Sequence, residues 1–82
     1  SGSEETMEVD LLPDAAVIGK AVKDLKFPDG VTILLINRGS KILIPKGGTI
    51  LERDDTLLIF GEKAKLSDVE KNLNRVEEAE PA

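Results

Sequence analysis

This chain has to fold without cross-links, because its 82 residues include neither cysteine nor histidine. A disulfide framework is therefore excluded, as are the thiolate and imidazole ligands of the commonest metal sites. Ile, Leu and Val together number 24, which is enough for a core, but a domain of this size buries only about 60–65% of its unfolded surface. Small domains without disulfides or metals often gain the missing stability by oligomerising. We therefore expect one small domain that associates with itself.

Composition excludes several functional classes. The formal net charge is −5, and Phe27 and Phe60 are the only aromatic residues, so neither a basic cluster nor a stacking platform is present for a nucleic acid polymer. No histidine and no nucleophile–base arrangement is found, and we predict a chain that is not an enzyme, with no catalytic residue, no metal site and no cofactor. The longest apolar run, residues 31–36, is too short to cross a bilayer, so we expect no direct membrane insertion.

Charge and composition also suggest the domain boundaries. Residues 1–8 and 77–82 are acidic and patternless, and we expect a disordered N-terminal tail and a frayed C-terminal tail there. Residues 9–76 contain 10 acidic and 11 basic residues, so the expected domain is close to neutral and can accept a small anion. Ser1-Gly2-Ser3 resembles a cloning remnant, which suggests that the chain is a piece of a larger protein.

Hydrophobic periodicity predicts the elements of the first half. Loose alternation predicts a strand over residues 7–12, ended by Pro13. Apolar residues at helical spacing predict a short helix over residues 14–25. The continuous aliphatic run over residues 31–36 predicts a strand covered on both faces, and the tight connection after it predicts a hairpin to a strand over residues 41–44.

The second half predicts two further strands and a final helix. Short apolar runs between turn residues predict strands over residues 49–51 and 56–60. Ser67 and Glu70 have the spacing of a capping box, which predicts a helix that begins at Ser67. Its core stripe would be Val69, Leu73 and Val76. The resulting order, β-α-β-β-β-α with the strand over residues 49–51 only brief, indicates an α+β fold in which short helices pack on a mainly antiparallel sheet.

Two polar clusters are best explained as turns. Residues 46–49 read Lys-Gly-Gly-Thr, but a phosphate-binding loop places its lysine after the glycines and leads into a helix, so we predict a hairpin turn. Glu52, Asp54 and Asp55 form the densest acidic cluster, yet they lack the spacing of a calcium loop. We predict a solvated turn there, with a glycosidase-type carboxylate pair as the less favoured alternative.

Arg38 is the strongest candidate for ligand binding. It ends the most apolar predicted strand and precedes Gly39, so its guanidinium can stand at the rim of the sheet, where arginine is suited to bidentate binding of phosphate or carboxylate. Ile44 and Pro45 follow the next strand and would form an apolar wall near the same rim. The alternative is an ordinary salt bridge between Arg38 and one of the many acidic residues.

An ordered succession of short segments resembles a known family. Residues 17–28 contain Val-Ile-Gly-Lys and Phe-Pro, residues 37–52 read NRGSKILIPKGGTILE, and residues 54–61 read DDTLLIFG. This succession covers most of the chain and resembles the C-terminal regulatory domain of potassium-transport proteins, the TrkA-C or RCK-C family.

The resemblance implies a homodimeric, regulatory and non-catalytic module on the cytoplasmic side of the cell membrane. Its partner would be the transmembrane portion of a cation transporter, and the segments look most like those of a potassium/proton antiporter. Some members bind cyclic di-AMP at the dimer interface, and the matching residues here are Asn37, Arg38, Ile44 and Pro45. Two functions stay open: a dimeric sensor of a cyclic dinucleotide or another small anion, and a ligand-free module that only assembles the transporter.

Overall fold

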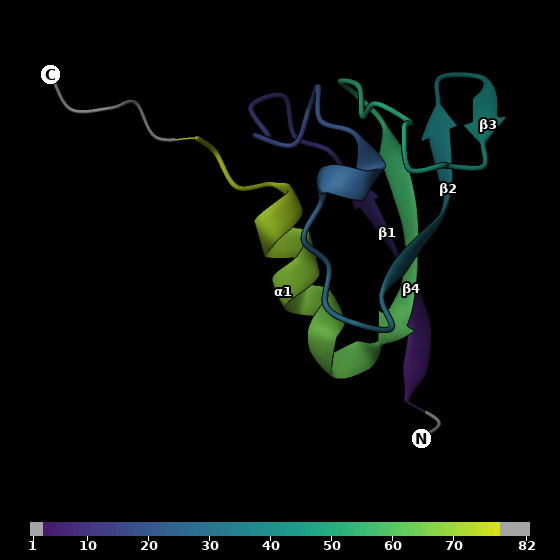
Figure 1. The fold of residues 1–82 in the computed structure, drawn as a ribbon, viewed down its shortest axis with the longest axis vertical. Helices are drawn as coiled ribbons and strands as arrows, with labels where there is room; N and C mark the ends of the chain where they lie inside the picture. Colours follow the sequence, from purple (N-terminus) through teal and green to yellow (C-terminus); the bar gives the residue numbers. More distant parts are fainter. Residues whose placement is uncertain (1–2, 78–82) are drawn as a thin grey trace, which may run out of the picture.

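The computed structural model describes residues 3–77 of the chain. Figure 1 shows a curved sheet with one helix and one largely irregular segment packed beside it. The elements in chain order are strand β1 (Glu4–Asp10), the 3₁₀ helix η1 (Val22–Asp24), strands β2 (Thr32–Arg38), β3 (Lys41–Leu43) and β4 (Thr56–Glu62), and helix α1 (Lys63–Leu73). The predicted α+β class is confirmed. Within these residues, no helix has the length and apolar character needed to cross a membrane.

The sheet has the strand order β1-β4-β2-β3, and every neighbouring pair is antiparallel. The first strand therefore pairs with the last one, with Glu4 opposite Glu62. The prediction of a disordered tail over residues 1–8 is wrong for residues 4–8, because these residues pair with β4. The rest of the two expected tails falls almost entirely on residues 1–2 and 78–82. These residues lie outside the described part of the chain.

The predicted hairpin between β2 and β3 is confirmed, with Arg38 opposite Lys41. Its connection is Gly39-Ser40, and Gly39 has a φ of +60°. Glycine reaches this left-handed conformation without the steric cost that a Cβ atom would impose, which suits the tight turns that join antiparallel strands.

The prediction that β2 is covered on both faces is wrong. Ile33 and Ile36 are buried on the face that packs against α1, called here the inner face. Between Ile33 and Leu35 the register shifts, which marks a β-bulge. The extra residue of a bulge interrupts the alternation of side chains, so Leu34 and Leu35 both lie toward the opposite, outer face, and Leu34 is 41% exposed.

The core forms where the inner face of the sheet meets α1 and the segment over residues 11–28. Leu66, Val69 and Leu73 supply the buried stripe of α1, at the i, i+3 and i+7 spacing of one helix face. The buried members of the core are Val9, Leu11, Val31, Ile33, Ile36, Leu51, Leu57, Ile59, Leu66, Val69 and Leu73.

Residues 14–25 do not form the predicted α-helix, and only the short η1 is helical there. The Gly19 N–H donates to the Leu51 carbonyl at 2.8 Å, and an isolated bridge pairs Ala21 with Ile50. Backbone groups that an α-helix would pair internally are therefore bonded to a neighbouring segment, and Gly19 has a φ of +90° that no α-helix contains. The strand predicted around Ile50 is likewise reduced to this bridge.

Helix α1 begins at Lys63 and contains the predicted N-cap Ser67 in its interior, so the prediction of a capping box is wrong. The chain enters the helix directly from β4, and Leu66 is buried in the first turn of the helix. Burial of Leu66 against the sheet requires helix upstream of Ser67. Val76, predicted as the last member of the core stripe, lies beyond the helix and is exposed.

Gly61 lies where β4 passes close to the start of β2. A Cβ atom there would lie 2.8 Å from Val31 Cγ2 and 3.2 Å from the Gly30 carbonyl oxygen, so Gly61→Ala would force the two strands to shift. We expect it to lower the free energy of unfolding by about 1–3 kcal/mol, measured by urea denaturation. Gly48→Ala is the matched control, because its Cβ would meet nothing within 4 Å. Equal losses in the two variants would contradict the close approach at Gly61.

Candidate functional site

Arg38, the last residue of β2, is held by hydrogen bonds on all three of its guanidinium nitrogens. Its Nε and Nη2 atoms donate to the two carboxylate oxygens of Asp55, each at 2.9 Å. Its Nη1 donates to Glu52 Oε2, and Nη2 also donates to the Ile50 carbonyl, again at 2.9 Å. The planar guanidinium thereby ties the end of β2 to the segment that leads into β4.

Asp55 is a completely buried carboxylate, with 0% of its surface exposed. Besides Arg38, it accepts a hydrogen bond of 2.9 Å from the Glu52 backbone N–H. Burial raises the pKa of Asp55, but the hydrogen bonds from Arg38 and Glu52 and the charge of Arg38 outweigh burial, so the pKa lies below its usual value. The hydrogen bond with Asp55 in turn raises the pKa of Arg38. These two shifts favour the ionised form of both groups. A buried ionised carboxylate needs a hydrogen-bonded partner of opposite charge, and Arg38 is that partner.

The turn predicted from the acidic cluster is confirmed, but the prediction that it is solvated is wrong for Asp55. The Asp55 N–H donates to the Glu52 carbonyl at 3.2 Å, and Asp54 has a φ of +68°, a left-handed conformation that Asp tolerates better than most residues. The salt bridge proposed as the alternative for Arg38 is present. The sequence-based prediction did not include the burial of Asp55, the partner of Arg38. The available signal was an arginine at the end of one apolar strand and an acidic cluster just before another apolar strand.

The other predicted site residues lie around the same end of the sheet. Asn37 is half-buried and sits opposite Ile42, and strand alternation directs it to the outer face. Ile44 and Pro45 follow β3, with Ile44 72% exposed and Pro45 half-buried. Arg38 alternates with Asn37, and its guanidinium lies on the inner side, against Asp55. The hairpin therefore brings the four residues to one rim but separates the guanidinium from Asn37.

The turn over residues 46–49 is also confirmed. The Lys46 N–H donates to Thr49 Oγ1 at 2.9 Å, and the Thr49 N–H donates back to the Lys46 carbonyl at 3.0 Å. These bonds close the turn, and both N–H groups donate to acceptors within it, whereas the N–H groups of a phosphate-binding loop converge on a phosphate.

The outer face of the sheet carries an apolar patch, called here the outer patch and formed by Leu34, Leu35, Ile42, Leu58 and Phe60. Leu35 and Leu58 pair across β2 and β4 at its centre. Around them, Ile42 is 70% and Phe60 is 36% exposed. None of the five belongs to the core cluster of residues 3–77. Contiguous exposed apolar surface on a small domain indicates an interaction site.

The four-stranded antiparallel sheet, with one helix on its inner face and an open apolar outer face, defines a small α+β module of the kind found in RCK domains. A solved structure described as an RCK domain with cda superimposes on this chain with a TM-score of 0.74, covering 83% of this chain and 96% of that one. The two are 20% identical in sequence, so this likeness concerns the fold. The TrkA-C domain family model matches residues 6–74. The chain belongs to the TrkA-C domain family, as its ordered motifs predicted.

Three relatives show how much of a larger protein such a domain represents. The Trk system potassium uptake protein TrkA homolog of Archaeoglobus fulgidus is 46% identical over 55 residues, which is 67% of this chain but 12% of that protein. TrkA of Vibrio alginolyticus is 44% identical over 66% of this chain and 12% of its own length. The TrkA homolog of Pyrococcus abyssi is 28% identical over 90% of this chain and 33% of its own length. The chain therefore spans an eighth to a third of these relatives.

Proposed function

We propose that this chain is a regulatory domain of a potassium transport system and acts on the cytoplasmic side of the membrane. Membership of the TrkA-C family supports this role, as do relatives that are named potassium uptake proteins. We expect no catalysis at Arg38, Asp55 and Glu52, because these residues hydrogen-bond one another and the neighbouring backbone. The membrane partner would be a transmembrane transporter. The motifs predict an antiporter, whereas the relatives are named as parts of potassium uptake systems.

The domain would act as a homodimer that pairs through the outer patch. The observation that carries this proposal is the exposure of Leu34, Ile42 and Phe60 on the sheet face that α1 does not cover. Burying such side chains contributes about 25 cal/mol for each Å² removed from water. A chain of this size, without disulfides, gains much from that contribution.

Sedimentation velocity across a range of protein concentrations tests the dimer. We expect a dimer at micromolar concentration, and we expect Leu58→Glu to be monomeric, because a carboxylate at the centre of the patch would be buried without a partner. Ser67→Glu adds the same charge at an exposed position of α1 and should stay dimeric. Circular dichroism would confirm that both variants fold. A monomeric wild-type domain, or a dimer that Leu58→Glu leaves intact, would contradict pairing through the outer patch.

A second candidate function adds a ligand: a small anion such as cyclic di-AMP, bound between two copies at the rim formed by Asn37, Arg38, Ile44 and Pro45. The observation that favours it is the unequal exposure of the two acids that hold Arg38. Asp55 is buried, whereas the Glu52 side chain is 59% exposed, so an anionic ligand could replace Glu52 at Nη1 without unpairing Asp55. The exposed Ile44 would contact the apolar part of such a ligand.

Calorimetric titration with cyclic di-AMP separates the two functions. If the ligand replaces Glu52, wild type should bind it, Glu52→Gln should bind it at least as tightly because a competing carboxylate is removed, and Ile44→Ser should bind it more weakly. Leu12→Ser, at an exposed aliphatic residue that is not part of the Arg38 network, is the control for Ile44→Ser. A dimer that binds no cyclic di-AMP would support the ligand-free assembly module.

A further inference from the structure

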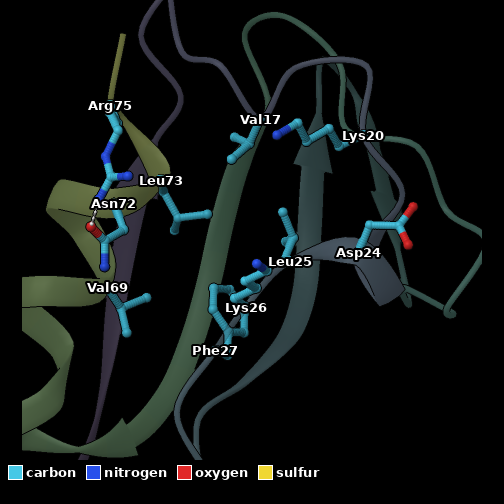
Figure 2. Close-up of a pocket in the computed structure, with 10 residues that line it drawn as sticks. All are labelled: Val17, Lys20, Asp24, Leu25, Lys26, Phe27, Val69, Asn72, Leu73 and Arg75. Carbon is cyan, nitrogen blue, oxygen red and sulfur yellow. Dashed lines mark hydrogen bonds between the residues drawn. The ribbon is translucent and has the colours of Figure 1, made fainter. Parts of the chain in front are cut away.

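A groove runs between α1 and the irregular segment over residues 17–28, on the inner side of the sheet. Figure 2 shows one end of this groove as a gap with Val69 and Leu73 on the helix side and Val17, Leu25 and Phe27 on the other. This end encloses about 360 Å³. A second hollow farther along α1 adjoins this end and shares Lys26, Phe27, Val69 and Asn72 with it. Ligand sites in proteins start at about 300 Å³, so the space suits a small molecule.

Three cations stand around this apolar floor. Lys20 and Lys26 belong to the irregular segment, and Figure 2 places Arg75 on the opposite wall, beside Asn72. Within residues 3–77, neither lysine makes a hydrogen bond or ion pair through its side chain, and Arg75 donates only to the neutral Asn72 Oδ1, at 2.7 Å. The lining of this end contains one acidic residue, Asp24, against these three cations, and the second hollow adds Asp68 and Lys65.

We propose that this groove binds a small molecule with a single anionic group on a short apolar body. The apolar walls would bury the body, and Lys20, Lys26 and Arg75, which are exposed at the mouth of the groove, would attract the anion. Hydrogen bonds between charged groups are stronger than those between neutral groups. A neutral apolar molecule would leave the three cations unpaired, and a bare anion would leave the walls of the groove wet. Both parts of the ligand are therefore required.

The site is independent of the dimer proposed above, because it lies on the inner side of the sheet, away from the outer patch. It is nevertheless connected to the Arg38 rim through the backbone. The Val22 N–H donates to the Thr49 carbonyl and the Lys23 N–H to the Gly47 carbonyl, both at 2.9 Å. The segment that forms one wall of the groove thus also holds the loop that leads to Glu52, a partner of Arg38. A ligand that shifts this wall would shift that loop with it.

Octanoate is the probe for this site, and binding is followed by ¹H–¹⁵N correlation spectra of the isotope-labelled chain. We expect saturable shifts concentrated in residues 25–27 and 69–75. Acetate, which lacks the apolar body, and 1-octanol, which lacks the charge, should each bind at least about tenfold more weakly, as expected for the loss of a charge-assisted interaction or of apolar burial.

A pair of double variants tests the role of the cations. Lys20→Gln with Lys26→Gln should weaken octanoate binding by about tenfold, whereas Lys41→Gln with Lys46→Gln removes the same charge from the exposed region around β3 and should leave binding unchanged. The proposal is overturned if 1-octanol binds as tightly as octanoate, if the two double variants weaken binding equally, or if the shifts map to the outer patch. Partition into anionic phospholipid vesicles without saturable binding of free octanoate would also overturn it, in favour of a lipid surface.

Discussion

Replacing Arg38 with alanine is expected to lower the free energy of unfolding by about 3–5 kcal/mol, the cost of leaving one partner of a buried ion pair alone. Asp55 is completely buried, and alanine would remove both hydrogen bonds that Arg38 donates to its carboxylate. The loss is large compared with the total stability of small domains, about 5–15 kcal/mol. In a thermal melt, each kcal/mol shifts Tm by about 4–8 °C for a domain of this size, so Tm should fall by at least about 12 °C.

Two matched variants show which part of the Arg38 cluster matters. Glu52→Gln removes only the exposed arm of the network and should cost no more than about 1 kcal/mol, as surface ion pairs do. Arg38→Lys keeps the charge but loses the planar fork, so its loss should lie between the other two. If Arg38→Ala and Glu52→Gln destabilised the domain equally, the ion pair with Asp55 would not be a main source of stability.

The pH dependence of stability should change sign between wild type and Arg38→Ala. In wild type the pKa of Asp55 is lowered by folding, so this group stabilises the fold above its unfolded pKa, and that contribution is lost as the pH falls through its folded pKa. Without Arg38, burial is opposed only by the Glu52 N–H, and it raises the folded pKa above the unfolded one. Acidification through that pKa should then relieve the penalty on Arg38→Ala. Urea denaturation at a series of acidic pH values measures both slopes, and parallel slopes would contradict the assignment.

Leu57→Ala is expected to lower the free energy of unfolding by about 2–5 kcal/mol, the range observed when a fully buried leucine is truncated. Leu57 is 0% exposed. It lies on β4, between β1 and β2, where it is opposite Val9 on β1 and Ile36 on β2. The cavity would therefore open between the two strands that flank β4. Urea denaturation measures the change. A lower midpoint with an unchanged m-value would show that the variant is less stable and still unfolds in a two-state manner.

The neighbouring residue provides the control. Leu58 follows Leu57 in β4 but belongs to the outer patch and is half-buried, so Leu58→Ala should cost the monomer much less than Leu57→Ala. Unlike Leu57→Ala, it should weaken dimerisation in sedimentation experiments. A larger loss of monomer stability at Leu58 than at Leu57 would reverse the assignment of the two sheet faces.

Local patterns in the sequence were sufficient where the interactions are local. The β2–β3 hairpin, the strand over residues 56–60 and the turns at residues 46–49 and 52–55 depend on short-range signals, and all are present in the structure. The family, too, follows from the ordered motifs. The final helix was predicted, but its start was not, because burial of Leu66 overrides the capping signal at Ser67.

The parts that sequence reasoning missed depend on partners far away along the chain. Residues 14–25 have helical spacing, yet the Gly19 N–H is bonded to Leu51 rather than to its own segment. The bulge in β2 cannot be seen in the sequence, because residues 33–36 are all aliphatic, although the bulge decides which leucines are exposed. The acidic cluster before β4 offers partners for Arg38, but nothing local distinguishes Asp55 from Glu52 and Asp54 as the buried one. Arg38 was predicted as a ligand-binding residue; its bonds in the structure are internal, and a ligand at its rim stays a proposal.

The pairing of β1 with β4 has a consequence for the order in which the domain folds. Every pair in that ladder joins residues 46 or more positions apart, whereas the β2–β3 hairpin closes across two residues. The entropic cost of closing the loop is therefore higher for β1 and β4. Topologies rich in such distant contacts fold slowly. During synthesis the ribosome delivers β1 first, and this acidic strand must stay unpaired until β4 has emerged. Within this domain, the strand that is synthesised first is therefore the last to pair. Its acidic side chains disfavour aggregation through its unpaired edge in the meantime.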